Sequence, residues 1–423
     1  MAEVRPLEAV HYDPETVSIS EVVAPPYDVI DAARRASLVA GSDRNVVRLD
    51  LPTADAEVGP AQDPYEWAAE AMRAWEAEGT LVRDSEPTLW AYEQDYTGPD
   101  GTRRTRRGFL SRIRVTDYGP GLVRPHERTQ PGPKQDRLRL TRATGHNMSP
   151  IFVLHEGDVW PHLRDAALAP AWAEVADPDG TVHRVWPIAE RAVHEAVAAE
   201  LESSELLIAD GHHRYETART YADEIGGEGP HRYTLACLVS LEDPGLSVFA
   251  THRLLEGLDK GKQEAIRDTL MSMFELSEAP GDRADQIVPP ADAGEIAFGY
   301  MDAHHGKPYH LVLKDRGALD AALDGFSSSY RQLDAAALET LILRGTLGMS
   351  SDDIAAKRGL AYCSDTDEAL RRIRAGEVDA GFLLRPTPVQ QVRDVAAAGE
   401  TMPPKSTYFF PKLLTGLLFN PLR

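Results

Sequence analysis

The hydrophobic positions of the chain follow two different periods. Short apolar runs of strand length alternate with longer stretches in which apolar residues recur every three or four positions, and this alternation predicts a mixed α/β fold. Strands are expected at 45–51, 88–96, 108–115, 149–155, 205–210, 233–241, 295–301 and 308–314. Helices are expected at 64–78, 187–201, 214–225, 263–275, 333–344 and 366–375. The Asp-Gly pair within 97–102 predicts a hairpin turn between two of the strands.

Breaks in this pattern divide the chain into three expected segments. A chain of 423 residues is long enough for two or three domains with cores of their own. We expect an N-terminal α/β segment over 1–110, a core over 111–255, and a C-terminal α/β segment over 256–423 whose tail packs back on the core. The two outer segments are expected either to frame a cleft or to mediate formation of a homodimer.

Charge and cysteine content exclude several classes of protein. The chain has 45 Lys and Arg against 67 Asp and Glu, and its net charge of −22 argues against nucleic acid or a membrane surface as a partner. Cys237 and Cys363 belong to no C-x-x-C pair, which argues against a thiolate zinc site and a disulfide scaffold. The sequence has no signal-peptide pattern and no apolar run of ~18 residues. We therefore expect a cytoplasmic protein.

A basic region interrupts this acidic chain. Twelve Lys and Arg residues lie between Arg103 and Arg142, and only three carboxylates oppose them. The even spacing of arginines in 103–114 is typical of outward-facing charges on a solvated edge strand, and we adopt that interpretation for this half. The second half, 124–140, combines proline, glycine and charge in a loop that leads into a helix, which fits a polyphosphate ligand better.

The sharpest chemical signal is the sequence ADGHHRYETA. An apolar strand ends at Asp210, the chain turns on Gly211, and a helix begins near Arg214. The unpaired N–H groups at a helix N-terminus attract anions, and Gly211 would let the backbone approach a phosphate. His212, His213 and Arg214 add side-chain donors, which an ordinary Asp-Gly turn does not need. We predict a phosphate site here, with Asp210 holding Mg²⁺ or capping the helix.

The loop RPHERT, at 124–129, contains a candidate acid–base pair. Glu127 lies next to His126 and among cations, which would keep its carboxylate ionised and ready to accept a proton. A surface carboxylate within an ion-pair network explains the same pattern equally well. Arg128 and Lys134 follow in the sequence as candidates for neutralising phosphate charge.

Two proline-rich segments complete the set of candidates. In MPPKSTYFFPKLL, at 402–414, Lys405 and its neighbours could close over a phosphate, although docking of the aromatic residues on the core is the favoured interpretation. In APPYDVI, at 24–30, two prolines fix the position of Tyr27 and Asp28, and a rigid loop is sufficient to explain that segment.

Five sequence blocks together resemble a protein family. The blocks are APPYDVI, RPHERT with the following KQDRLRL, ADGHHRYETA, THR (251–253) and MPPKSTYFFPKLLTG, and in this order they resemble domain-of-unknown-function family 1015 over nearly the whole chain. That family is similar to the ParB/sulfiredoxin superfamily. The resemblance implies a ParB/sulfiredoxin-like nucleotide-binding core in 111–255, with the G-x-x-R turn of the superfamily at Gly211 to Arg214. ParB-type motifs have alanine three residues after the arginine, where this chain has Thr217.

The members of that superfamily differ in their chemistry. Sulfiredoxin-like enzymes have a cysteine directly after the turn glycine, where this chain has His212, and ParB adds a helix-turn-helix for which we find no pattern here. Free-serine kinases resemble the chain most, because they pair a D-G-H-H-R-type turn with a glutamate in a short upstream loop. Glu127 is the residue that fits this glutamate.

The resemblance therefore implies a kinase that uses ATP or ADP with Mg²⁺ and phosphorylates a small hydroxyl compound, with free L-serine as the leading candidate. Glu127 would be the base, Asp210 would orient Mg²⁺ or the acceptor, and the residues that follow Asp210 would bind phosphate. The alternative is a ParB-like regulatory protein that binds or hydrolyses a nucleotide without an acceptor. A hydrolase with a metal on His212 or His213 is disfavoured, because adjacent side chains diverge.

Overall fold

The computed structural model describes residues 3–53 and 63–423, and the chain divides into two compact units. The first unit comprises Met1–Pro125, Thr129–Ser247 and Pro411–Arg423, and the second comprises His126–Arg128 and Val248–Phe410. Both units contain helices and strands, so the expected mixed α/β class is confirmed. The first unit combines the expected N-terminal segment with most of the expected core.

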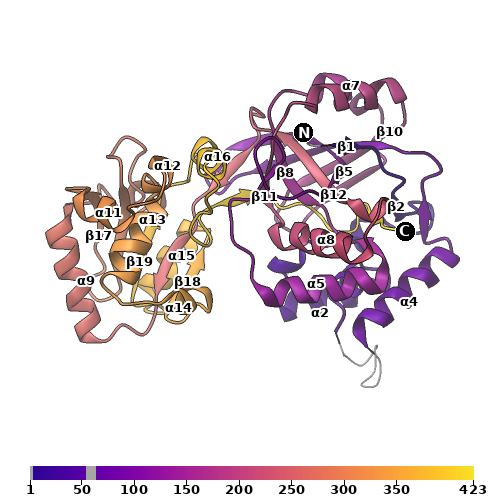
Figure 1. The fold of residues 1–423 in the computed structure, drawn as a ribbon. Helices are drawn as coiled ribbons and strands as arrows, with labels where there is room; N and C mark the ends of the chain where they lie inside the picture. Colours follow the sequence, from indigo (N-terminus) through magenta and orange to yellow (C-terminus); the bar gives the residue numbers. More distant parts are fainter. Residues whose placement is uncertain (1–2, 54–62) are drawn as a thin grey trace. The chain divides into compact units, whose positions relative to one another are not determined.

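A nine-stranded mixed sheet forms the centre of the first unit (Figure 1). Its strand order is β6-β11-β8-β12-β5-β4-β10-β9, and β1 pairs with β5 in addition. The strands are β1 (Val4–Arg5), β4 (Leu89–Thr97), β5 (Arg103–Arg114), β6 (Val123–Arg124), β8 (Ile151–His155), β9 (Ala173–Ala176), β10 (Val182–Ile188), β11 (Leu206–Asp210) and β12 (Tyr233–Ser240). β4 and β5 form the hairpin expected around 97–102.

Helices cover both faces of this sheet. Figure 1 shows α7 on one side and α5 with α8 on the other. The helices of eight or more residues are α2 (Ala32–Gly41), α4 (Pro64–Ala77), α5 (Pro131–Thr144), α7 (Arg191–Leu201) and α8 (His212–Ile225). The shorter elements are α1 (Ile19–Val22), η1 (Tyr27–Val29), α3 (Val47–Asp50), α6 (Trp160–Leu163), η2 (Ala166–Leu168) and η3 (Pro230–Arg232), with strands β2 (Val10–Tyr12), β3 (Leu81–Arg83), β7 (His146–Asn147) and β21 (Asn420–Pro421).

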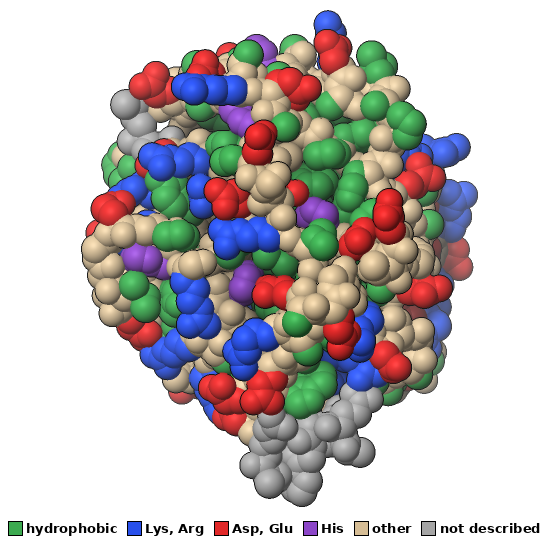
Figure 2. Space-filling view, turned by 90° about the vertical axis from the view of Figure 1, so that its right-hand side faces the viewer, with side chains coloured by type: hydrophobic (Ala, Val, Ile, Leu, Met, Phe, Trp, Pro, Cys, Tyr) green, Lys and Arg blue, Asp and Glu red, His purple; other side chains and the backbone are tan. Residues whose placement is uncertain are grey.

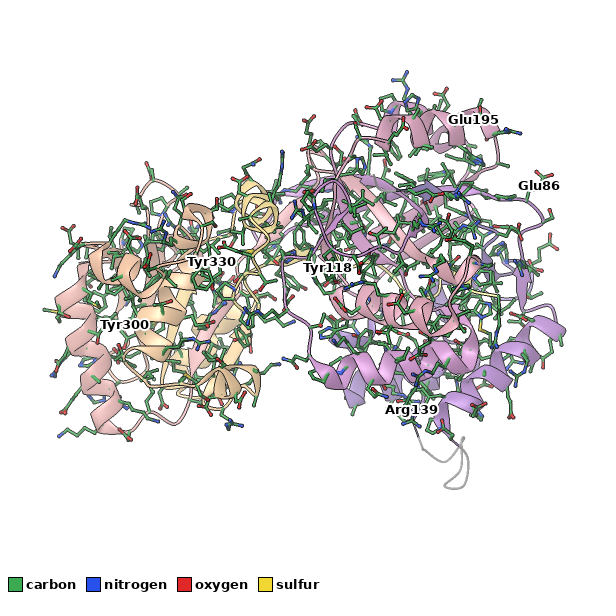
Figure 3. All side chains as sticks on the ribbon, in the orientation of Figure 1. Glu86, Tyr118, Arg139, Glu195, Tyr300 and Tyr330 are labelled. Carbon is green, nitrogen blue, oxygen red and sulfur yellow. The ribbon has the colours of Figure 1, made fainter. Side chains whose placement is uncertain are left out.

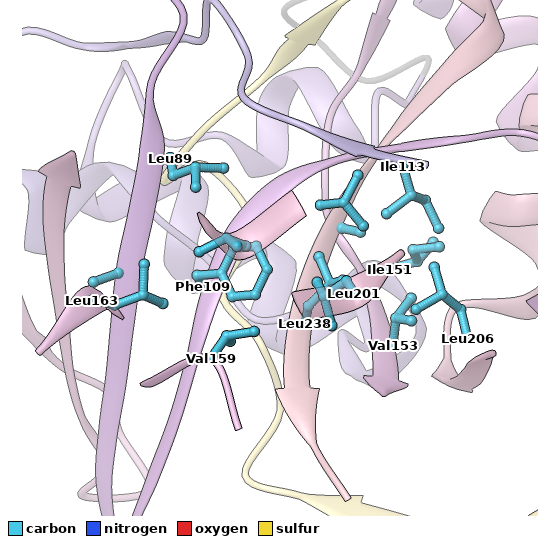
Figure 4. Close-up of a cluster of buried hydrophobic side chains, with 14 of the residues drawn as sticks. Leu89, Phe109, Ile113, Ile151, Val153, Val159, Leu163, Leu201, Leu206 and Leu238 are labelled. Atoms are coloured by element: carbon cyan, nitrogen blue, oxygen red, sulfur yellow. The ribbon is translucent and has the colours of Figure 1, made fainter. Parts of the chain in front are cut away.

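The core of the first unit lies between the sheet and its helices. Aliphatic side chains of β8, β11 and β12 meet Val159 and Leu163 from the α6 region and Leu201 from α7 (Figure 4). These side chains are almost fully buried, and each contributes on the order of 1.5–3 kcal/mol relative to an exposed position. The sheet is therefore a rigid support for the loops at the ends of its strands.

The interpretation of 103–114 as a solvated edge strand is wrong. Residues 108–114 of β5 pair with β12 on one side and with β4 or β1 on the other, so this part is an interior strand, whereas 103–107 pair with β4. Arg106 is only 1% exposed, and its guanidinium donates to the Gln94 side chain at 2.9 Å and to the Pro411 carbonyl at 2.7 Å. Arg107 pairs with Glu93 at 3.0 Å on the neighbouring strand. These arginines are charged groups held within a sheet and are not a solvated edge.

The segment NVVRLDL, expected as a strand, instead contains the short helix α3. Asn45 causes this, because its side-chain oxygen accepts from the Val47 N–H at 3.0 Å. Its amide group also donates to the carbonyls of Glu21 and Val23. An apolar run of this length cannot distinguish a buried strand from a buried helix, and here the local side-chain bonds decide.

The second unit is built on a six-stranded sheet with the order β15-β17-β16-β19-β14-β18. These strands are β14 (His252–Leu255), β15 (Phe274–Glu278), β16 (Ala297–Asp302), β17 (Pro308–Leu313), β18 (Leu360–Cys363) and β19 (Ala380–Leu384), and all their pairings are antiparallel. The remaining elements are α9 (Lys260–Met273), α10 (Ala284–Ile287), α11 (Gly317–Ala322), α12 (Ser328–Arg331), α13 (Asp334–Leu338), α14 (Ser351–Ala355), α15 (Thr366–Arg374), α16 (Val389–Ala397), β13 (Ser247–Phe249) and β20 (Tyr408–Phe410). The helix expected at 333–344 is α13 followed by a π-helical turn, η4 (Glu339–Arg344).

The C-terminal residues 411–423 return to the first unit. Their apolar side chains are buried, and the Thr415 and Phe419 backbones bond to Ala24 and Val10 near the N-terminus. This segment therefore closes the first unit from the far end of the chain. Across residues 3–53 and 63–423, no helix combines the length and the apolar character that a membrane span requires.

Candidate functional site

The predicted phosphate turn is a tight corner between β11 and α8. β11 ends at Asp210, where a register shift against β8 interrupts the ladder, and such irregularities redirect side chains next to functional sites. Gly211 has φ +92°, in the left-handed region. A Cβ atom at Gly211 would lie 3.0 Å from the Ile151 side chain and 3.1 Å from the Arg214 guanidinium. Conformation and space both require glycine at this corner.

Two helix N-termini meet at this corner. α8 begins directly after Gly211, and α5 begins after Gln130, whose N–H donates to His213 Nε2 at 2.9 Å. This bond requires an unprotonated Nε2. Each helix has 14 residues and carries a partial positive charge at its N-terminus. The corner therefore concentrates backbone N–H groups and positive potential, as an anion site requires.

The side chain of Arg214 braces the turn. Its guanidinium donates to the Pro150 carbonyl, just before β8, and lies 3.5 Å from Asp210 Oδ2. Lys412 Nζ lies 3.6 Å from the same carboxylate oxygen. Asp210 is one-quarter exposed and is flanked by two cations, so it joins α8 to the C-terminal segment of the first unit.

A buried ion pair lies beside the brace. Arg137 of α5 pairs with Asp50 at 2.8 Å, and both side chains are about 95% buried. Burial raises the pKa of Asp50, and the charges of Arg137 and Arg214 oppose that rise. The Arg137 guanidinium lies 4.3 Å from the centre of the Tyr27 ring, and burial raises the pKa of Tyr27 to about 12. Arg214 thus belongs to a buried charge cluster and also to the turn.

A cavity of about 30 Å³ lies within this cluster, between Asp50, Arg137, Arg214 and β7. That volume is sufficient for about one water molecule. The cavity is too small for a nucleotide, so any anion at this corner would bind on the outer side of the turn, at the helix N-termini.

The structure distributes the predicted residues between the two units. Within the first unit it brings Asp210, Gly211, His213 and Arg214 together, and Lys134 lies in the first turn of α5, where its carbonyl accepts from Thr217 Oγ1 at 3.4 Å. The side chain of His212, in contrast, is directed into the protein and is 4% exposed.

The remaining predicted residues belong to the second unit. His126 Nε2 lies 3.0 Å from Thr407 Oγ1, and the His126 carbonyl accepts from the Met402 N–H at 2.8 Å. Arg128 Nε donates to Thr401 Oγ1 at 3.1 Å. The loop 126–128, which contains Glu127, is therefore attached to the 401–407 segment, in which Lys405 is exposed and has φ +57°.

Sequence analysis assigned no site role to four residues around the turn. Lys412, Asp50, Arg137 and Tyr27 lie close to Asp210 or to Arg214. Tyr27, Arg137 and Lys412 stand within blocks that carry the family resemblance, namely APPYDVI, KQDRLRL and MPPKSTYFFPKLLTG, and that was a usable signal. Asp50 carried no such signal, because its importance depends on an ion pair across 87 residues.

The basic region of the sequence is mostly neutralised. Arg124 pairs with Glu205, Arg142 with Glu224, and Arg139 with Asp63. Figure 2 shows Lys and Arg side chains beside Asp and Glu on one face of the first unit, and Figure 3 labels Arg139 on α5. Much of the positive charge of this region is therefore paired with carboxylates within the first unit.

Fold and site together define a mixed α/β protein with a strand–turn–helix corner at Gly211. Residues 4–336, most of the chain, match the family model described as "Protein of unknown function (DUF1015)", and the chain belongs to that family. The comparison with curated proteins finds no match.

Several solved structures are similar to the chain at low identity. A conserved hypothetical protein from Pyrococcus furiosus is 16% identical, with 70% of this chain and 92% of that chain covered and a TM-score of 0.35. A free serine kinase in complex with AMP is 16% identical, with 70% and 88% covered and a TM-score of 0.35. SbnI with a C-terminal truncation, from Staphylococcus aureus, is 10% identical, with 72% and 85% covered and a TM-score of 0.34.

Proposed function

We propose that the protein is a kinase that transfers a phosphoryl group from ATP or ADP to a small hydroxyl metabolite, with free L-serine as the leading acceptor. The observation that carries the proposal is the meeting of two helix N-termini at the Gly211 turn, where Gln130 N–H donates to His213. Phosphoryl transfer depends mainly on positioning and on neutralisation of phosphate charge, and this corner offers both.

The turn residues have separate roles in this proposal. The N–H groups that begin α8 bind the phosphate oxygens, and the absence of a side chain at Gly211 permits the approach. Arg214 holds the turn in shape through Pro150 and adds positive charge behind it. His213 is fixed by Gln130, which directs its ring at this corner.

Glu127 is the proposed general base. It lies three residues before Gln130 in the sequence. A carboxylate in that loop can accept the proton of the acceptor hydroxyl as the phosphoryl group moves. His126, beside it, is tied to Thr407 and would position the loop.

Mg²⁺ is the cofactor that the family resemblance implies. No group of three metal-ligating side chains occurs in residues 3–53 and 63–423. Mg²⁺ commonly uses only one or two carboxylates together with phosphate oxygens, and Asp210, at the turn, fits that use. When bound, the ion would neutralise phosphate charge, while Lys412 and Arg214 hold the Asp210 carboxylate in place.

The experiment compares Glu127→Gln and Arg214→Ala in the full chain. We expect Glu127→Gln to lower turnover by about 10²–10⁴-fold while nucleotide affinity, measured by calorimetry, stays nearly intact. Arg214→Ala should weaken nucleotide binding itself. Glu86→Gln and Arg191→Ala, both exposed positions of the first unit, are the matched controls. Full activity of Glu127→Gln would remove that residue from the mechanism.

A screen of amino acids and polyols as acceptors, with each of four nucleotides, tests the reaction class. Phosphorylated product supports the kinase. Slow nucleotide hydrolysis with no accepted acceptor would instead identify a regulatory protein of the ParB type, which needs the same turn but no Glu127 base. No nucleotide binding at all would refute both.

A further inference from the structure

The C-terminal segment of the first unit brings a lysine to the Gly211 turn. Residues Pro411–Arg423 belong to that unit, and Lys412 Nζ lies 3.6 Å from Oδ2 of Asp210, the residue directly before the turn glycine. The Lys412 side chain is 19% exposed, so it is neither fully buried nor a freely solvated surface lysine. The turn therefore has beside it a cation that comes from the far end of the chain.

The backbone of this segment is anchored on buried side chains of the central sheet. Arg106 of β5 donates to the Pro411 carbonyl at 2.7 Å, and Gln94 Nε2 of β4 donates to the Lys412 carbonyl at 3.0 Å. The two anchors also bond to each other, because Arg106 Nε donates to Gln94 Oε1 at 2.9 Å. Both anchor residues are 1% exposed. The backbone position of Lys412 is therefore fixed from the core of the unit.

Arg106 is a costly anchor. Its guanidinium bonds to an amide oxygen and a backbone carbonyl, and among the residues that the structure describes no carboxylate pairs with it. Burial lowers the pKa of Arg106, because a cation that leaves water without an opposite charge is destabilised. The guanidinium lies 4.5 Å from the centre of the Phe152 ring, and Phe152 is the β8 residue opposite Asp210 in the ladder. This buried cation therefore holds the Lys412 segment near the strand end that leads into the turn.

An ion pair with Asp210 does not by itself account for this arrangement. The 3.6 Å between Lys412 Nζ and Asp210 Oδ2 is longer than a hydrogen bond, and Arg214 lies 3.5 Å from the same oxygen. A partly exposed pair of this kind contributes little to stability. An ammonium group has three N–H donors, so Lys412 can contact a phosphate oxygen while it stays beside Asp210.

We propose that Lys412 is the phosphate-binding lysine of the Gly211 turn, and that its ammonium group contacts the phosphate of a nucleoside diphosphate or triphosphate bound at the N-terminus of α8. This inference rests on the proposed function, and it gives Lys412 the part for which the sequence offered Lys405, a residue of the second unit. Lysine binds phosphate as a point charge, which requires proximity more than a fixed geometry.

The test measures binding of ADP to the full chain by calorimetry, without added Mg²⁺. Lys412→Met keeps a long unbranched side chain and removes its charge, and it should weaken ADP binding about tenfold or more, as expected for loss of a charged hydrogen bond. Lys412→Arg keeps the charge and should retain most of the affinity. Lys260→Met removes the same charge from an exposed position of the second unit and should leave the affinity unchanged.

A double-mutant cycle with Asp210→Asn separates contact with phosphate from support of Asp210. If Lys412 contacts phosphate, Lys412→Met should weaken ADP binding by a similar factor when Asp210 has already been replaced. If Lys412 acts only by holding the Asp210 carboxylate, Lys412→Met will have no further effect in that background, and the inference is overturned.

The outcomes also separate this inference from the proposed function. It is overturned, with the kinase left in place, if Lys412→Met binds ADP as tightly as the wild type, if Lys412→Arg loses as much affinity as Lys412→Met, or if ADP binds only when Mg²⁺ is added. ADP binding that depends on Lys412, in a protein that phosphorylates no acceptor, would refute the kinase and support the phosphate-binding lysine. No binding of ADP with or without Mg²⁺ would overturn both.

Discussion

The two ends of strand β8 carry opposite chemistry. At the Ile151 end lie the Gly211 turn, the N-termini of α5 and α8, and the side chains of Arg214 and Lys412, all of which are donors or positive charges. At the His155 end lie a neutral imidazole acceptor and a group of carboxylates. The strand itself is buried throughout, and all its residues before His155 are apolar.

This difference shows that the buried sheet holds the two ends in place, whereas the segments that connect its strands and helices provide the polar and charged groups. The donor end is built from helix N-termini, which are fixed by the direction of the chain after β11. The acceptor end is built from individual side chains in the loops after β8 and β12. The donor end should therefore depend on backbone conformation and on the buried charges that support it, and the acceptor end on single side chains.

The largest expected effect comes from the buried ion pair that supports the donor end. Arg137→Met should lower the free energy of unfolding of the first unit by about 3–5 kcal/mol, because Asp50 is left buried without its partner. Arg139→Met, two residues along α5, removes an exposed pair with Asp63 and should cost at most about 1 kcal/mol. Urea unfolding followed by Trp fluorescence reports on the first unit alone, because all six Trp residues lie in it. Equal losses in the two variants would contradict the buried-pair account.

The pKa values of two histidines, one near each end of β8, allow the two ends to be compared directly. Burial, together with the charges of Arg423 and Arg83, lowers the pKa of His146, which lines the small cavity with Arg214, to about 4. Burial also lowers the pKa of His155, but there the neighbouring carboxylates of Asp158 and Glu200 oppose the shift. We expect His146 to titrate below His155 when both are followed by NMR. The reverse order would contradict the assignment of charge to the two ends.

The His146 shift also sets a pH dependence of stability. Between pH 6.5 and 4 the unfolded chain binds a proton at this residue and the folded chain does not, so stability falls as the pH is lowered through that range. The loss by pH 4 is about 3 kcal/mol, and stability is fully present above pH 6.5. His146→Asn should flatten this part of the profile, measured by urea unfolding at a series of pH values. An unchanged profile would show that other groups cause the acid sensitivity.

The smallest effect on stability is expected at the turn itself. Gly211→Ala and Gly180→Ala both place a side chain at positive φ, which should cost about 1–2 kcal/mol in thermal unfolding, and Gly211→Ala should cost more than Gly180→Ala because of its closer contacts. A Cβ at Gly180 meets open space, whereas a Cβ at Gly211 meets Ile151 and Arg214. Only Gly211→Ala should therefore also weaken nucleotide binding. Undiminished nucleotide affinity in that variant would place the phosphate elsewhere.

Much of the fold was accessible from local pattern. The strand ending at Asp210, the turn on Gly211 and the helix after it follow from an apolar run, a glycine and a 3.6-residue period, all of which are local properties. Interior and edge strands, however, can show the same alternation of charged and other residues. The alternation in 103–114 therefore could not distinguish an edge strand from an interior one, and the edge interpretation was wrong. Only the tertiary structure shows that Arg106 is buried, because it donates to Gln94 on β4 and to the Pro411 carbonyl of the C-terminal segment.

The sequence by itself determined the mixed α/β class, the position of the strand–turn–helix corner and the family, because these depend on periodicity and on contiguous motifs. The tertiary structure alone decided that Lys412 reaches Asp210, that Arg137 pairs with Asp50, and that Arg106 is buried against Gln94 and the Pro411 carbonyl. Each of these depends on residues distant in sequence, and the energy of a buried charge or acceptor is set by whatever the fold places beside it.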